Sequence, residues 1–235
     1  MKRRTNSLDV RKITYLAMLT ALVVVLQFAG SFIKFGMFSI SLVLVPIVVG
    51  AAICGPVCGA WLGFMFGIIV LVSGDAARFL TIDPLGTIIT VIVKGTLAGL
   101  VCGLVYKIFE QKNKYVAVFS SAVVCPIVNT GIFLLGCLLF FMDTINEWAM
   151  AFGYESAGAY MILVLAGGNF LFELLFNVLL GPVIVTLIGI APSLSRSARA
   201  KKEIDKNSTE ETYKCEFCGE ERKRGDGGCS NCGAK

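Results

Sequence analysis

The chain has 235 residues, 56% of them hydrophobic and 16% charged, and a soluble domain of this length cannot bury so much apolar surface, so a polytopic membrane protein is expected. The sequence has no histidine and no Walker A glycines before Lys94, so we expect neither an enzyme nor an ATP site. The net charge of +5 does not indicate nucleic-acid binding, because the basic residues cluster at the ends of apolar segments, where the positive-inside rule accounts for them.

Six apolar segments follow one another along the sequence and predict an all-α domain of six transmembrane helices over residues 1–192. Helices are required because backbone polar groups cannot remain unpaired in lipid. The second and third segments are short and are separated only by Gly55 and Pro56, which predicts a tight helical hairpin. With ends defined to a few residues, the segments are 13–29, 38–54, 57–74, 85–107, 116–142 and 160–190.

The charged residues between these segments predict the orientation of the chain. With six spans, three basic regions fall on one side, which the positive-inside rule makes cytoplasmic. We therefore expect a multi-pass protein of the plasma membrane with both termini in the cytoplasm. The basic residues are Lys2, Arg3, Arg4, Arg11 and Lys12, then Lys107, Lys112 and Lys114, and finally Arg196, Arg199, Lys201 and Lys202.

Glycine recurs every four residues in the third and fourth segments. This spacing forms a smooth stripe along one helix face and lets two helices approach closely. We interpret the stripes as packing surfaces. They comprise Gly55, Gly59, Gly63 and Gly67 in one segment and Gly95, Gly99 and Gly103 in the other.

Two ionisable residues, Lys94 and Glu173, lie deep within apolar segments. A charge at the centre of a membrane span costs at least about 2.5–3.5 kcal/mol, so such residues face a partner or a cavity. We interpret them, with the polar residues on their helix faces, as the lining of an outward-facing substrate cavity. The candidate substrate-binding residues are Lys94, Thr90, Thr87, Asn129, Asn169, Glu173, Asn177 and Arg78.

Each of these residues also has a purely structural interpretation. Lys94 and Glu173 lie at similar depths and would then pair with each other, locking two helices together. Arg78 would form a local pair with Asp75, three residues earlier. Asn169 and Asn177 would bond to neighbouring helices.

The order of elements resembles the substrate-binding S component of energy-coupling factor (ECF) transporters over residues 10–192. The resemblance rests on RKITYLAMLTAL, on the Gly55, Pro56 and Gly59 turn, and on VIVKGTLAGLVCGLVYKIF. It implies capture of a vitamin on the outer side and delivery through a coupling protein driven by two cytoplasmic ATPases. It also implies that Ala17 and Ala21 dock on the coupling protein and that residues 30–39 gate the site.

The C-terminal tail carries two Cys-x-x-Cys pairs, and we predict a zinc-ribbon-like module over residues 214–235 after a flexible charged linker at 193–213. Four thiolates at this spacing suit tetrahedral zinc, and with all four positions filled the site is structural. Rubredoxin-like iron ligation is the alternative. The predicted ligands are Cys215, Cys218, Cys229 and Cys232.

Three other functions compete with a substrate-binding subunit: a stand-alone secondary transporter, a zinc-dependent membrane sensor and, least favoured, a membrane enzyme. The buried lysine slightly favours a carboxylate-bearing ligand, such as pantothenate, over a cation such as thiamine. This preference for a carboxylate is limited, because Glu173 can neutralise Lys94 in place of a ligand.

Overall fold

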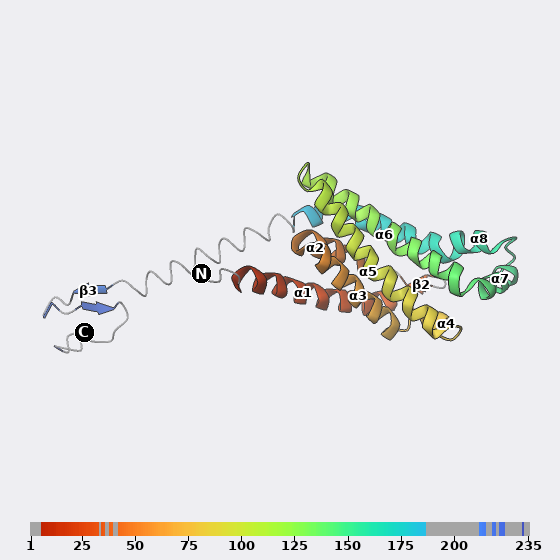
Figure 1. The fold of residues 1–235 in the computed structure, drawn as a ribbon, viewed down its shortest axis with the longest axis horizontal. Helices are drawn as coiled ribbons and strands as arrows, with labels where there is room; N and C mark the ends of the chain where they lie inside the picture. Colours follow the sequence, from red (N-terminus) through yellow and green to blue (C-terminus); the bar gives the residue numbers. More distant parts are fainter. Residues whose placement is uncertain are drawn as a thin grey trace. The chain divides into compact units, whose positions relative to one another are not determined.

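The computed structural model describes residues 6–32, 34–35, 38–39, 42–186, 212–214, 218–219, 221–223 and 232. The chain divides into two units, Met1–Ile188 and Gly189–Lys235. The first unit is the helical bundle of Figure 1. In the second unit, the described residues include an antiparallel pair of strands, β3 (Thr212–Lys214) and β4 (Glu221–Lys223).

Within the described residues, four helical runs are long and apolar enough to cross a membrane. This confirms the predicted helical membrane domain for those four runs. Two further apolar helices, α2 (Leu44–Cys54) and α3 (Pro56–Val72), are only 11 and 17 residues long, so the number of six spans stays a prediction. The long runs are α1 (Asn6–Ser31), α5 (Pro84–Phe109), α6 (Lys114–Phe140) and the succession α8 (Ala157–Tyr160), η1 (Met161–Gly167) and α9 (Gly168–Leu179).

The sixth predicted segment is not a regular α-helix. Its middle part, η1, is a π-helix of seven residues between α8 and α9, a form that is rare and often found at functional sites. Helical residues continue at 181–186.

The connection between α2 and α3 is the tight turn that the sequence predicts. Gly55 has a φ of +102°, which glycine adopts without a steric penalty. Pro56 occupies the first position of α3, where its missing N–H costs no hydrogen bond. The second segment, predicted from residue 38, becomes helical only at Leu44. Before it lie two short antiparallel strands, β1 (Lys34–Phe35) and β2 (Phe38–Ser39).

The glycine stripes of α3 and α5 face each other, which confirms their predicted role in packing. A Cβ added to Gly63 would lie 2.6 Å from the carbonyl carbon of Gly95, and one added to Gly99 would lie 2.5 Å from that of Gly59. The two backbones are therefore in direct contact along this face. Gly55, included in the predicted stripe, instead forms the turn before α3.

The helices α4 (Ala77–Leu80) and α7 (Met142–Ala151) lie at the same end of the bundle (Figure 1). Phe79 of α4 makes edge-on contacts with Phe141 and Trp148 at centroid distances of 5.0 and 5.9 Å. At this end α5 begins at its N-cap Asp83, whose side chain accepts a hydrogen bond from the Leu85 N–H. This end of the bundle contains the candidate site.

Candidate functional site

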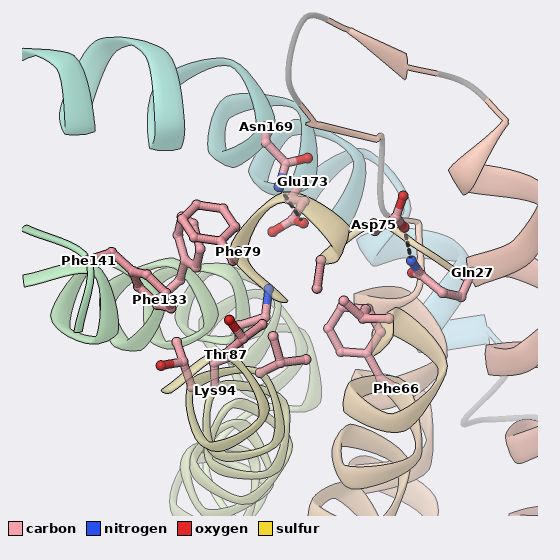
Figure 2. A pocket seen from close by; sticks show the side chains of 14 residues that line it. Gln27, Phe66, Asp75, Phe79, Thr87, Lys94, Phe133, Phe141, Asn169 and Glu173 are labelled. Atoms are coloured by element: carbon pink, nitrogen blue, oxygen red, sulfur yellow. Dashed lines mark hydrogen bonds between the residues drawn. The ribbon is translucent and has the colours of Figure 1, made fainter. Parts of the chain in front are cut away.

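A cavity with about 620 Å³ of empty space, part of it open to solvent, lies where α1, α3, α5, α6 and α9 meet beside α4. Figure 2 shows side chains from these elements pointing toward one another around it. Its lining combines a lysine, two carboxylates and several phenylalanines. The lining residues are Gln27, Phe66, Val70, Asp75, Ala76, Phe79, Thr87, Thr90, Val91, Lys94, Phe133, Phe141, Asn169 and Glu173.

Lys94 of α5 reaches into this cavity between two aromatic rings. Its Nζ lies 5.8 Å from the ring centroid of Phe66 and 5.3 Å from that of Phe133, within the range of a cation–π interaction. Among the residues that the structure describes, no salt bridge joins Lys94 to Glu173, and the Lys94 Nζ lies against these two rings.

Glu173 of α9 is buried, with 2% of its surface exposed. Its Oε1 accepts a hydrogen bond of 3.0 Å from the Asn169 side-chain amide, and its Oε2 accepts one of 3.3 Å from the Asn129 amide. Asn129 belongs to α6, so the carboxylate joins α6 to α9. This places Asn129, Asn169 and Glu173 in one polar cluster.

A second cavity, with about 310 Å³ of empty space, adjoins the first. The two cavities share Lys94, Phe133 and Asn169. Asn129 and Thr130 line the second cavity. The Oδ1 atom of Asn129 is buried without a hydrogen-bond partner in the described part of the chain, which leaves an acceptor available there.

Gln27 and Asp75 also line the main cavity, and neither is among the site residues predicted from the sequence. The Gln27 amide of α1 donates a hydrogen bond to Asp75 Oδ2, across 48 positions of sequence. Gln27 is 3% exposed, and its Oε1 has no partner among the described residues. A lone amide interrupting the apolar run of α1 was the available signal for Gln27.

Phenylalanines form the apolar wall of the cavity. Phe79 packs edge-on against Phe133 at 5.7 Å, and Phe66 and Phe133 flank Lys94. Phenylalanine is common in apolar helices, so the sequence offered no sign that these rings lie together. A wall of this kind suits a flat or apolar part of a ligand.

The two predicted threonines of α5 differ in their surroundings. Thr90 is buried in the lining, and its Oγ1 has no hydrogen-bond partner within the described residues. Thr87 also lines the cavity, but its hydroxyl donates to the Asp83 carbonyl oxygen at 2.7 Å. The Thr90 hydroxyl can therefore bind a ligand, whereas the Thr87 hydroxyl already donates a hydrogen bond to the N-cap residue of its own helix.

Two predicted residues are not brought to the cavity. Arg78 is exposed on α4 and does not belong to the lining of either cavity. Asn177 is buried one helical turn beyond Glu173, also outside both linings, and its side-chain amide has no partner within the described part of the chain. The polar stripe of α9 thus extends past the cavity.

The predicted zinc site falls only partly within the described structure. Cys215 and Cys229 lie outside the described residues, and Cys218 and Cys232 are exposed. Within the described ranges alone, no group of three metal-ligating side chains is found.

The site thus offers one cation and two buried hydroxyls on α5, that of Thr90 having no hydrogen-bond partner within the described residues. The facing helices add amide and carboxylate oxygens, and phenylalanines form an aromatic wall. No nucleophile activated by a neighbouring base is present among the lining residues, so the arrangement suits recognition of a small polar molecule with an apolar part.

The comparisons with known proteins agree with a binding role. A family model described as "ECF transporter, substrate-specific component" matches residues 11–185. Among solved structures, the fold is similar to that described as "Native-SAD phasing for ThiT from Listeria monocytogenes serovar", with a TM-score of 0.58 and 20% identity over 79% of this chain and 97% of that chain. No curated protein matches the chain. Because the family model covers well over half of the sequence, the chain belongs to the substrate-specific components of ECF transporters and is a transporter subunit, not an enzyme.

Proposed function

We propose that this protein captures a vitamin or related micronutrient at the outer face of the plasma membrane and delivers it to an ECF coupling protein driven by two cytoplasmic ATPases. The observation that carries the proposal is the cavity of Lys94, Thr90 and Glu173, enclosed by helices of a transporter subunit. Both termini are proposed to be cytoplasmic, as the basic residues flanking the apolar segments favour.

The proposed substrate carries a carboxylate, as in pantothenate. Lys94 has no carboxylate in salt-bridge contact among the described residues, and Thr90 Oγ1, one helical turn before it on α5, has no partner. Together they would donate hydrogen bonds to an anionic group. At the opposite side of the lining, the oxygens of Gln27 and Glu173 would accept hydrogen bonds from N–H or O–H groups of the same ligand.

The proposed surface for the coupling protein is the face of α1 that contains Ala17 and Ala21. Both alanines are exposed, as are Met18 and Val25, at 66% and 62%. The small side chains at i and i+4 leave room for a partner helix to approach closely. This face is exposed in the isolated subunit and is therefore accessible to another membrane protein.

The test is to identify the small molecule released from the detergent-purified full chain by mass spectrometry, and then to measure its affinity for variants. Lys94→Met retains the bulk of the side chain but removes the ammonium group. A hydrogen bond to a charged group contributes about 1.5–3 kcal/mol, so the variant should bind a carboxylate-bearing ligand about 10- to 150-fold more weakly.

Lys107→Met serves as the matched control, because Lys107 lies in the last turn of α5, outside both cavity linings. Unchanged affinity in Lys94→Met, with the protein inserted and folded, contradicts the assignment of the site. Uptake that proceeds in vesicles without the ATPases contradicts the proposed transport mechanism.

A further inference from the structure

The C-terminal tail contains a second feature that the transport site does not explain. Two Cys-x-x-Cys pairs are separated by ten residues, and each pair is followed directly by a glycine. The match to the transporter family ends at residue 185, so the tail lies outside the part of the chain for which the family accounts. The tail also belongs to a separate compact unit, Gly189–Lys235.

Cys218 lies between two paired strands of the tail. Strands β3 and β4 pair antiparallel with Thr212 opposite Lys223 and Lys214 opposite Glu221, and Cys218 falls between Lys214 and Glu221 in sequence. Gly219, directly after Cys218, has a φ of +75°. An added Cβ there would meet no atom within 4 Å. The left-handed conformation, and not lack of space, therefore favours glycine at this position.

This tail has too few large apolar side chains to fold around a hydrophobic core. Residues 212–235 contain only Tyr213 and Phe217 as large apolar residues. Modules of this size need disulfides or a metal for stability. The basic residues place the tail in the reducing cytoplasm of the proposed topology, where disulfides are disfavoured, so a metal is the expected source of stability.

We propose that the tail binds one Zn²⁺ through Cys215, Cys218, Cys229 and Cys232 in a closed, structural site. Two of these, Cys215 and Cys229, lie outside the described residues, and their assignment rests on the spacing of the two pairs. A zinc ion with four thiolates carries a net charge of −2.

The test is the metal content of the full chain, purified in detergent with a thiol reductant and an affinity tag that lacks histidine. Mass spectrometry of the elements should find one zinc per chain in the unaltered protein. The double variant Cys218→Ser/Cys232→Ser should contain less than about a tenth of that amount. Cys58→Ser, at the start of α3, is the matched control and should retain the full zinc content.

Cobalt provides a measurement that does not depend on a variant. Co²⁺ added to the chelator-treated, reduced protein should give the visible absorption of a tetrahedral tetrathiolate complex, and zinc should displace it at a stoichiometry of one. Iron in place of zinc, a disulfide within either pair in freshly isolated protein, or equal zinc in the double variant each overturns the proposal. Vitamin binding by the helical unit is measured separately, and failure of either proposal leaves the other unaffected.

Discussion

The direct contact between the backbones of α3 and α5 predicts that Gly63→Ala weakens both folding and substrate binding. The added Cβ would lie 2.6 Å from the carbonyl carbon of Gly95, whereas ordinary contact begins at 3.4 Å, so the helices must separate locally by about 0.8 Å or more. A gap of about 0.5–1 Å loses a quarter to a half of the dispersion energy between the atoms involved.

Overpacking of this kind typically costs about 1–3 kcal/mol, and a chain of this length loses roughly 2–4 °C in Tm per kcal/mol. We therefore expect the Tm to fall by about 2–12 °C. Ligand binding should weaken as well. The ring centroid of Phe66 in α3 lies 5.8 Å from Lys94 Nζ in α5, which is near the limit of about 6 Å for a cation–π interaction.

The assay is thermal unfolding in detergent, followed by ligand affinity. Gly131→Ala is the matched control: Gly131 is also within a long helix, α6, but its added Cβ would meet no atom within 4 Å. Alanine favours helix by up to about 1 kcal/mol over glycine, so this control should melt at or above the original Tm. If the Tm of Gly63→Ala equals that of Gly131→Ala, and its ligand affinity is unchanged, the two backbones are not in contact and the reasoning is refuted.

Three further predictions concern the site and the proposed interface. Glu173→Gln replaces one acceptor with a donor, so one of its two amide partners loses a hydrogen bond. We expect the free energy of unfolding to fall by about 1–3 kcal/mol, and an unchanged Tm would contradict the polar cluster. Gln27→Leu removes the hydrogen bond to Asp75 and should weaken ligand binding severalfold in equilibrium titrations, whereas retained affinity would exclude Gln27 from the site. Ala21→Trp should leave ligand affinity unchanged but lower ATP-driven uptake in reconstituted vesicles by at least about tenfold. The same substitution at the exposed Leu139 of α6 should leave uptake unchanged. Equal loss of uptake at both positions would argue against a docking face at α1.

Much of this arrangement follows from helical periodicity. The spacing of four between Gly59 and Gly63 placed both on one face, and the same periodicity placed Asn169 and Glu173 side by side. These inferences succeed because a helix fixes the relative directions of its own residues.

Periodicity does not show where the face of a helix meets its neighbours. Asn177 continues the stripe of Asn169 and Glu173 but lies beyond the cavity. The contact of Gln27 with Asp75 joins α1 to the turn after α3, and it depends on how those elements pack. The start of α2 at Leu44 could not be predicted from the sequence either, because residues 38–43 are almost as apolar as the helix that follows.

The π-helix η1 gives the sixth segment one place where its length can change without cost to the site. A π-helix accommodates about one more residue per turn than an α-helix. Loss of one residue from Met161–Gly167, with a return to α-helical winding, would therefore leave α9 facing almost the same way relative to α8. A deletion between Asn169 and Glu173, where the winding is α-helical, would instead rotate Glu173 by about 100° away from Asn169. Relatives should therefore vary in length within Met161–Gly167 more readily than between Asn169 and Glu173.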